Sequence, residues 1–229
     1  MLKGQKKITR KEMKKDPFFE RIDQSVRFYN ENQQKIYIVL AVLMVLILAG
    51  WGVSQYWSSK AKSASSMLGI AQQYYFARDY DSARSKFSEL RALYGKSEYA
   101  GYALYYSAMI EYNEGKYEQA RKLLNEYLAD FGSDIEFISA ASATLGAIAA
   151  QAKEYGPAAA HYQKGAEKTA NLTNKKDFYQ RAFSYYLKSS QLKKAEMILA
   201  AVEKLKFADD KSKQELINSM QSMLTLAEK

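Results

Sequence analysis

The most apolar stretch of the chain is residues 36–53, which contain no charged side chain and read IYIVLAVLMVLILAGWGV. As a helix, these 18 residues span about 27 Å, close to the thickness of the hydrocarbon core of a bilayer. Leu, Ile and Val fill eleven of the positions, and each favours insertion by roughly 0.3–0.6 kcal/mol. The pattern therefore predicts one transmembrane helix.

Two other interpretations of this apolar run are weaker. A cleaved signal peptide has an apolar core of about 7–15 residues, whereas here 35 residues precede a longer core and no A-x-A-like site follows it. A buried helix in a soluble core is disfavoured because the run is apolar on every face. Trp51, Tyr56 and Trp57 stand where aromatic residues flank a membrane span. We therefore expect an uncleaved anchor over residues 36–57.

Beyond the anchor, a pattern of small and large residues repeats every 37 or 38 positions. In each unit an aromatic residue or Leu is followed three positions later by alanine and four positions after that by a large residue. The aligned alanines are Ala83, Ala120, Ala158 and Ala195. At a constant offset upstream stand Ala71, Ala108, Gly146 and Phe183. Short polar breaks divide each unit in two, at residues 77–79, 114–116, 152–154 and 189–191.

This period predicts a stack of helical hairpins. The small residue on the first helix lets the second helix approach closely, and the large residue fills the space toward the next unit. The last stretch predicts one further helix from about Asp210, with one apolar face formed by Leu216, Met220, Met223 and Leu224. The fold class that follows is all-α: one N-terminal transmembrane helix, an α-solenoid of about four hairpins, and a C-terminal helix.

The distribution of charge predicts the orientation of the anchor. Residues 1–35 contain ten Lys or Arg and five acidic residues, and so carry +5 of the formal net charge of +9. Only Lys60 and Lys62 follow the anchor before the repeats. Because Lys and Arg are retained in the cytoplasm, we expect a cytoplasmic N-terminus and exported repeats. A basic tail can also bind nucleic acid, but beside a membrane these charges serve topology and anionic lipid, so no nucleic-acid partner is expected.

The basic tail also contains signals for short amphipathic helices. Thr9 and Glu12 fit a capping box, and Asp16 followed by Pro17 fits the start of a second helix. One helical face then carries Phe18, Ile22, Val26 and Tyr29. This face either lies in the cytoplasmic headgroup layer or docks on a partner, and a frayed tail with accidental periodicity is the remaining alternative.

Composition limits the chemistry of the chain. It contains no cysteine, which rules out disulfides, thiol catalysis, thiolate metal sites and a lipid-modified N-terminal cysteine. The single histidine, His161, is expected on a second helix as a partly exposed surface residue. The sequence contains no metal-ligand cluster, phosphate loop or serine elbow. We therefore expect a protein that is not an enzyme and has no catalytic residues, cofactor or metal site.

The repeats resemble the tetratricopeptide repeat. In the second unit the signature positions hold Leu104, Ala108, Gly115, Tyr117, Ala120, Leu124 and Tyr127, and in the third Gly146 stands at the family's glycine. The period exceeds the family's 34 residues by three or four, and the closing proline is missing. The fourth unit, with Phe183 at a small position, departs from the pattern and is expected to act as a cap. The resemblance implies a right-handed solenoid whose first helices line a concave face.

The order of the segments is similar to a narrower family, the ancillary subunit of the bacterial Sec translocon. A lysine-rich tail, a span with Gly50-Trp51 and Tyr56-Trp57 at its end, and tetratricopeptide-like repeats follow one another. The resemblance implies a single-pass protein of the bacterial inner membrane that sits beside the translocation channel with a periplasmic chaperone. We accordingly expect a cytoplasmic tail (1–35), a transmembrane helix (36–57), a juxtamembrane linker (58–63) and a periplasmic repeat domain (64–229).

The family's concave positions supply the candidate partner-binding residues. They are Leu68, Gln72, Tyr75, Tyr102, Tyr105, Met109 and Tyr112, followed in the third repeat by an alanine-rich floor at Ala140, Ala143, Ala147 and Gln151. Rigid amphipathic tyrosines suit the binding of varied polypeptides. For Tyr102, Tyr105 and Tyr112, burial under the C-terminal helix or against another repeat is an equal alternative. Five further tyrosines occupy packing positions and are expected in the core: Tyr74, Tyr80, Tyr117, Tyr155 and Tyr186.

The function that we expect is a non-catalytic, membrane-tethered scaffold. Its expected partners are translocon subunits, a periplasmic chaperone or unfolded chains. A scaffold for division, pilus or secretion machinery is the main alternative, because nothing in the repeats distinguishes the two. An outer-membrane assembly lipoprotein is disfavoured by the absence of cysteine, and an enzyme by the absence of catalytic motifs.

Overall fold

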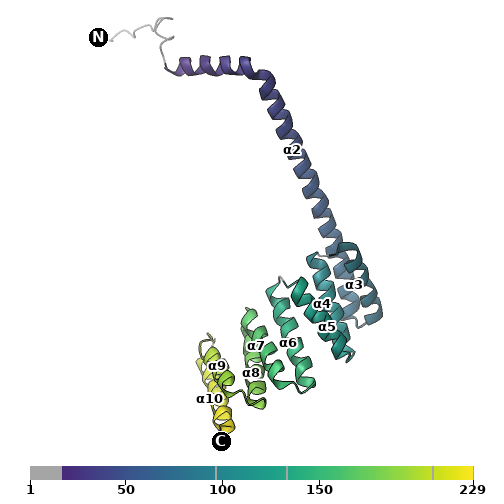
Figure 1. Cartoon of the computed structure of the whole chain (residues 1–229), viewed down its shortest axis with the longest axis vertical. Coiled ribbons are helices and arrows are strands. Elements are labelled where there is room, and N and C mark those ends of the chain that lie inside the picture. Colours follow the sequence, from purple (N-terminus) through teal and green to yellow (C-terminus); the bar gives the residue numbers. More distant parts are fainter. Residues whose placement is uncertain (1–16, 96, 133, 208, 229) are drawn as a thin grey trace, which may run out of the picture. The chain divides into compact units, whose positions relative to one another are not determined.

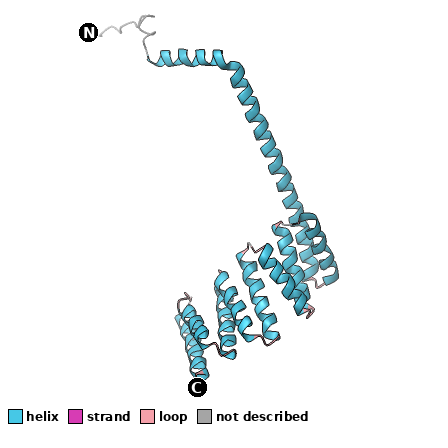
Figure 2. Cartoon of the chain, viewed as in Figure 1, coloured by secondary structure: helices cyan, strands magenta, loops and turns pink. Residues whose placement is uncertain are grey.

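The computed structural model describes residues 17–95, 97–132, 134–207 and 209–228, and every regular element among them is a helix (Figure 1, Figure 2). The helices are α2 Pro17–Phe76, α3 Tyr80–Tyr94, α4 Glu98–Asn113, α5 Tyr117–Asp130, α6 Ile135–Gln151, α7 Tyr155–Lys168, α8 Leu172–Lys188, α9 Leu192–Glu203 and α10 Asp210–Ala227. The predicted all-α class is confirmed. The capping box expected at Thr9–Glu12 and the cap expected at Asp16 lie outside the described residues.

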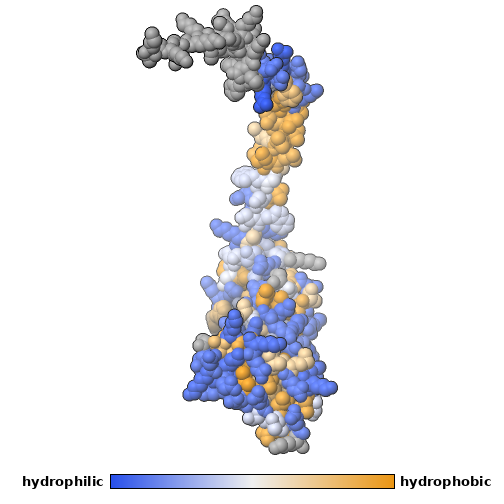
Figure 3. All heavy atoms as spheres, turned by 90° about the vertical axis from the view of Figure 1, so that its left-hand side faces the viewer, coloured by the Kyte–Doolittle hydropathy of each residue, from blue (hydrophilic) through white to orange (hydrophobic). Residues whose placement is uncertain are grey.

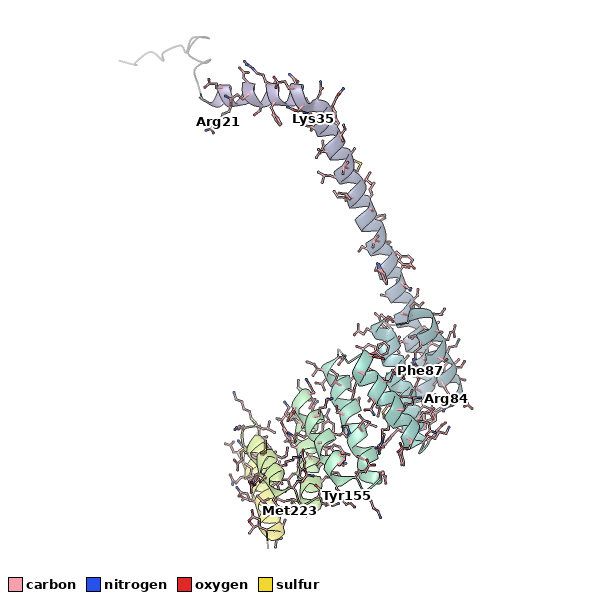
Figure 4. All side chains as sticks on the ribbon, in the orientation of Figure 1. Arg21, Lys35, Arg84, Phe87, Tyr155 and Met223 are labelled. Atoms are coloured by element: carbon pink, nitrogen blue, oxygen red, sulfur yellow. The ribbon has the colours of Figure 1, made fainter. Side chains whose placement is uncertain are left out.

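The chain divides into two compact units, Met1–Ala61 and Lys62–Lys229. In the first unit, α2 begins at Pro17, the predicted first helical position. It changes direction near Lys35 and then runs through the apolar stretch without a break (Figure 4). In the described chain this is the one helix long and apolar enough to cross a membrane, by length and composition. Its apolar side chains form the exposed band in Figure 3.

The boundaries expected within α2 are not marked by any break in the helix. Residues 58–63, expected as a linker, continue the helix from the candidate span into the second unit. The span, the linker and the start of the repeats all lie within one helix. The boundaries of the transmembrane helix (36–57) and of the repeat domain (64–229) therefore remain predictions.

In the second unit the helices form antiparallel pairs, and the repeat predicted from the sequence sets their register. The aligned aromatic or Leu residues begin the second helix of each hairpin: Tyr80, Tyr117, Tyr155 and Leu192. The first helices of the four pairs are the C-terminal end of α2, α4, α6 and α8, and α10 packs beside α9. Side-chain oxygens cap several starts by accepting backbone amide hydrogens, at Asp79, Ser97, Asp134, Asn171 and Asp209.

The core of the second unit consists of the repeated small and large residues. All four aligned alanines are fully buried, and so are Phe87 and Leu124 at the large positions. In the third hairpin the large residue is Tyr162, and Gly146 faces its ring so closely that a Cβ atom there would lie 2.8 Å from Tyr162 Cδ2. The glycine that resembles the family's signature therefore has a local cause, because the bulkiest side chain needs the smallest neighbour.

Two expectations about single residues are wrong. Tyr74 was expected in the core but is 38% exposed. Its equivalent in the next repeat, Glu111, contacts Arg84 of the preceding hairpin. Within the described residues no hairpin precedes the first one, so Tyr74 lacks such a neighbour. Met223 was expected on the apolar face of α10 but is 39% exposed, whereas Ile217 is buried. The remaining predicted apolar residues of α10 pack against the preceding hairpin.

Candidate functional site

The predicted partner-binding residues fall into three structural settings. Leu68 is 8% exposed and belongs to the core shared by α2, α3 and α4, so it offers almost no surface to a partner. Gln72 is half-buried and lies near the hydroxyl of Tyr106, where it acts to lower the pKa that burial raises. Met109 is half-buried, and its sulfur lies 3.8 Å from Thr144 Oγ1. These three side chains therefore serve mainly to hold neighbouring helices together.

Tyr102 and Tyr105 pack across the boundary between the second and third repeats. Their ring centroids lie 4.6 and 4.8 Å from that of Phe137 on α6. The Tyr102 hydroxyl donates to Glu98 Oε1 at 2.6 Å and lies 3.1 Å from Asp134 Oδ2. Burial raises the pKa of both tyrosines. Of the two alternatives weighed from the sequence, these contacts match packing against another repeat.

Tyr75 borders an open hollow at the turn of the first hairpin. The hollow measures about 470 Å³ and is lined by Tyr75, Phe76, Arg78, Tyr80 and Asn113. Asn113 Nδ2 donates to the hydroxyls of Tyr75 and Tyr80, each at 3.3 Å. Phe76 is 71% exposed at its rim. The amide thus ties the first helix of the second repeat to both helices of the first.

Tyr112 borders a second hollow, which lies on the face formed by the first helices of three consecutive repeats. We call it the three-repeat hollow; it measures about 300 Å³ and is lined by Tyr112 of α4, Ala147, Ala150 and Gln151 of α6, Tyr162 of α7, and Arg181 and Tyr185 of α8. Of the three alanines expected as a floor, Ala147 lines this hollow, whereas Ala143 is 8% exposed and belongs to a core cluster. Hydroxyl, amide and guanidinium groups provide the polar part of the lining.

Stacked tyrosines support one wall of the three-repeat hollow. The rings of Tyr155, Tyr185 and Tyr162 stack in a column, with centroid distances of 6.0 and 5.8 Å and interplanar angles of 11° and 10°. Lys188 Nζ lies 5.3 Å from the Tyr185 ring centroid, and the Arg181 guanidinium lies 5.6 Å from that of Tyr162. Cations over aromatic faces are stabilised by the ring quadrupole.

Arg181 is the charged group of the three-repeat hollow. Its Nε donates to Asp177 Oδ2 at 2.8 Å, and this hydrogen bond raises the pKa of the guanidinium. About half of its side chain remains exposed, and its guanidinium lies against the Tyr162 ring. A guanidinium next to hydroxyl and amide groups suits carboxylate and main-chain carbonyl oxygens.

The sequence pattern did not predict four residues of this hollow: Ala150, Tyr162, Arg181 and Tyr185. Tyr162 stands at a large packing position of the repeat pattern, and the fourth repeat departs from that pattern. The period gives no signal for the last two residues, because Arg181 stands 37 residues after Thr144 and Tyr185 stands 37 residues after Ile148, which is a buried core position.

The remaining titratable groups do not assemble around the hollow into a recognisable catalytic set. His161 lies on α7, is half-buried, and has its pKa lowered first by burial and then by Lys164 and Arg121. Within the described ranges, no group of three or more His, Asp or Glu side chains is placed to hold a metal ion. The groups that line the hollow can form hydrogen bonds, charged contacts and aromatic contacts, which are interactions suited to recognition.

The comparison with known protein families agrees with this architecture. The model of the tetratricopeptide repeat-like domain family matches residues 26–171, which is more than half of the chain. The match begins before the apolar stretch and ends immediately before α8, so it includes the candidate span and three hairpins. No curated protein matches the chain. Domains of this kind are typically non-catalytic scaffolds for protein partners, and the chain belongs to the tetratricopeptide repeat-like domain family.

Proposed function

We propose that this protein is a membrane-tethered scaffold that binds protein partners or emerging polypeptide in the periplasm, at the Sec translocon and together with a periplasmic chaperone. The apolar stretch of α2 anchors it in the inner membrane, with the basic tail in the cytoplasm and the repeats exported. It acts by binding and positioning its partners and catalyses no reaction. The binding role is supported by family membership and by the three-repeat hollow, and the place of action is supported by the order of segments.

The observation that carries the binding role is the three-repeat hollow. It is lined by the first helices of three repeats, so an extended polypeptide lying across them would meet each repeat in turn. Arg181 and Tyr112 supply donors for carboxylate or carbonyl oxygens, and the alanines leave room for the bound main chain. Rigid tyrosines add contact area at a low cost in conformational entropy. We therefore expect an extended peptide with acidic side chains to bind best.

Protease treatment of intact spheroplasts tests the topology. In the proposed orientation, the protease digests the repeats and leaves a protected fragment that contains the N-terminal tail and the span. Digestion of the tail with protection of the repeats would show the opposite orientation. Extraction of the intact protein by alkaline carbonate would show that it does not span the membrane.

Affinity purification of the intact protein from mild detergent, followed by mass spectrometry, tests the partners. We expect translocon subunits and a periplasmic chaperone, and we expect their recovery to fall with Arg181→Gln. Lys164→Gln on α7 is the matched control, because it also removes one exposed positive charge but lies away from the hollow. Recovery of division, pilus or secretion proteins in place of the channel would assign the scaffold to another envelope assembly. Equal recovery with both variants would remove the hollow from the binding role.

A further inference from the structure

The part of α2 that precedes the candidate span has one apolar face. Ile22, Val26 and Tyr29 lie on this face, which we call the apolar stripe, and they are 41%, 50% and 42% exposed. At about 100° per residue, the opposite face holds Glu20, Gln24, Arg27, Glu31 and Lys35. The stripe residues belong to none of the core clusters formed by the described chain. This segment is therefore an amphipathic helix whose apolar face has no cover within its own unit.

The direction of the apolar stripe follows from a contact across the bend in α2. Tyr29 and Tyr37 are eight residues apart, which corresponds to about 12 Å along a straight helix. Their hydroxyl oxygens nevertheless lie 2.6 Å apart, and their rings meet edge to face. The helix α2 changes direction near Lys35, between the two residues (Figure 4). Because the tyrosines contact each other across this bend, both lie on its inner side. Because Tyr29 is one of its residues, the apolar stripe also faces the inner side of the bend.

A bilayer around the span would occupy the inner side of this bend. Tyr37 is the second residue of the apolar run, so the inner corner coincides with the edge of the hydrocarbon layer. The helix before the span bends away from it at this point, with its apolar stripe on the inner side of the bend. The stripe would therefore contact lipid along the length of this helix. Its charged face then points to water, which is the arrangement of an interfacial helix.

We propose that residues 20–34 lie in the headgroup layer at the N-terminal end of the span, with the apolar stripe buried among lipid. This inference rests on the membrane span of the proposed function. The stripe borders a shallow hollow of about 480 Å³ lined by Arg21, Ile22, Ser25, Val26 and Tyr29. Arg21 is the cation of this hollow and suits a lipid phosphate, while the apolar members suit the upper part of the acyl chains.

The lipid contact is expected to depend more on apolar burial than on anionic lipid. Residues 20–34 carry three acidic and two basic side chains, and with Lys35 at its end the segment is neutral. A neutral amphipathic helix gains its affinity from the apolar area that it removes from water. Zwitterionic phosphatidylcholine is therefore a sufficient membrane for the test.

Single-cysteine labelling can test the proposal directly, because the natural chain contains no cysteine. The full-length variants Ile22→Cys and Val26→Cys carry an environment-sensitive fluorophore on the stripe, and Gln24→Cys and Glu31→Cys carry it on the opposite face. Each is placed in phosphatidylcholine nanodiscs with a lipid-borne spin label near the headgroups. We expect the fluorophores at 22 and 26 to lose most of their emission and those at 24 and 31 to keep it.

A further variant, Ile47→Cys in the middle of the apolar run, distinguishes failure of the interfacial helix from failure of the membrane span. If position 47 is quenched by a spin label deep in the bilayer while 22 and 26 behave like 24 and 31, the span stands and the interfacial helix is refuted. If position 47 is not quenched, the membrane span itself fails. If 22 and 26 escape the lipid quencher but are shielded from aqueous iodide in native membranes only, the stripe docks on a protein and the lipid assignment is wrong.

Discussion

At the scale of single residues, the four hairpin turns share one unusual backbone conformation. The second residue of each polar break has a positive φ: 61° at Arg78, 75° at Gly115, 60° at Lys153 and 55° at Ser190. An L-residue in this left-handed region costs roughly 1–2 kcal/mol, whereas glycine adopts it freely. Only the second repeat has glycine at this position, so three turns hold a strained residue.

Lys153→Gly is expected to stabilise the protein. Relief of the left-handed strain outweighs the extra entropy of glycine in the unfolded chain, and we expect a gain of about 0.5–1 kcal/mol. The measurement is the midpoint of chemical denaturation of the full chain in detergent micelles, followed by circular dichroism. Lys164→Gly inside α7 is the matched control and should destabilise by about 1 kcal/mol. A loss of stability in both variants would contradict the role of the positive φ.

Glu136 makes stability depend on pH at the start of α6. Its carboxylate accepts a hydrogen bond from the Thr169 hydroxyl at 2.7 Å and from the Ala170 amide at 2.9 Å, and these bonds lower its pKa. A carboxyl whose pKa is lower in the folded state contributes stability above its unfolded pKa, and this contribution is lost as the pH falls through the folded value. The carboxylate thus ties α6 to the loop after α7 at neutral pH.

Glu136→Gln should therefore lower stability at pH 7 and flatten the decline of stability below about pH 5. Denaturation midpoints measured between neutral pH and about pH 3 would show the curves of wild type and variant converging at acid pH. The same substitution at Glu196, on the exposed face of α9, serves as the control and should leave the pH profile unchanged. Parallel curves for wild type and Glu136→Gln would refute the assignment.

At the scale of helices, the third hairpin differs from the second at two facing core positions. One position holds a smaller residue and the other a larger one. The second hairpin places Ala108 and Leu124 at the positions that hold Gly146 and Tyr162 in the third. All four residues are buried, and the Tyr162 ring occupies the space that a Cβ atom of residue 146 would need. Close packing makes each choice depend on the other.

A double-mutant cycle can measure this dependence. Gly146→Ala alone should cost about 1–3 kcal/mol because the Tyr162 ring must move, and Tyr162→Leu alone should cost a few kcal/mol for its lost contacts. The combination rebuilds the pair of the second hairpin, so its cost should be smaller than the sum of the two. Gly69→Ala, where no atom lies within 4 Å of the added carbon, should stabilise α2 and serves as the control. Additive costs would show that the two positions are independent.

The sequence predicted the helices and turns well because both depend on a local, repeated pattern. The starts of α3, α5, α7 and α9 and the helix from Asp210 all follow from short spacings. The candidate site was harder to predict, since Tyr102 and Tyr105 are covered by Phe137 of the next repeat. Their exposure depends on how two hairpins pack, which no spacing within one repeat reveals. Arg181 joins the hollow for the same reason, through the stacking of a fourth repeat on the third.

At the scale of the whole repeat domain, each hairpin contacts mainly its neighbours, so stability should vary along the stack. The core clusters follow this order: one joins α2, α3 and α4, the next joins α4, α5 and α6, and the last extends from α6 to α10. Charged pairs also join successive repeats, as at Arg84 with Glu114 (2.8 Å) and Arg121 with Glu154 (3.0 Å). A destabilising substitution at one end of the stack should therefore lower local stability there more than at the other end.

The helix α10 closes the last cluster and offers a matched pair of residues to test this gradient. Met220 is 1% exposed and shares a cluster with Val202 of α9, whereas Met223 is 39% exposed one turn away. Met220→Ala should cost about 2–5 kcal/mol locally and speed amide hydrogen exchange in α8, α9 and α10, while exchange in α3 and α4 stays unchanged. Met223→Ala should change neither region. Faster exchange in every helix after Met220→Ala would mean that the repeats unfold as one cooperative unit, and the neighbour-by-neighbour account of their stability would then be wrong.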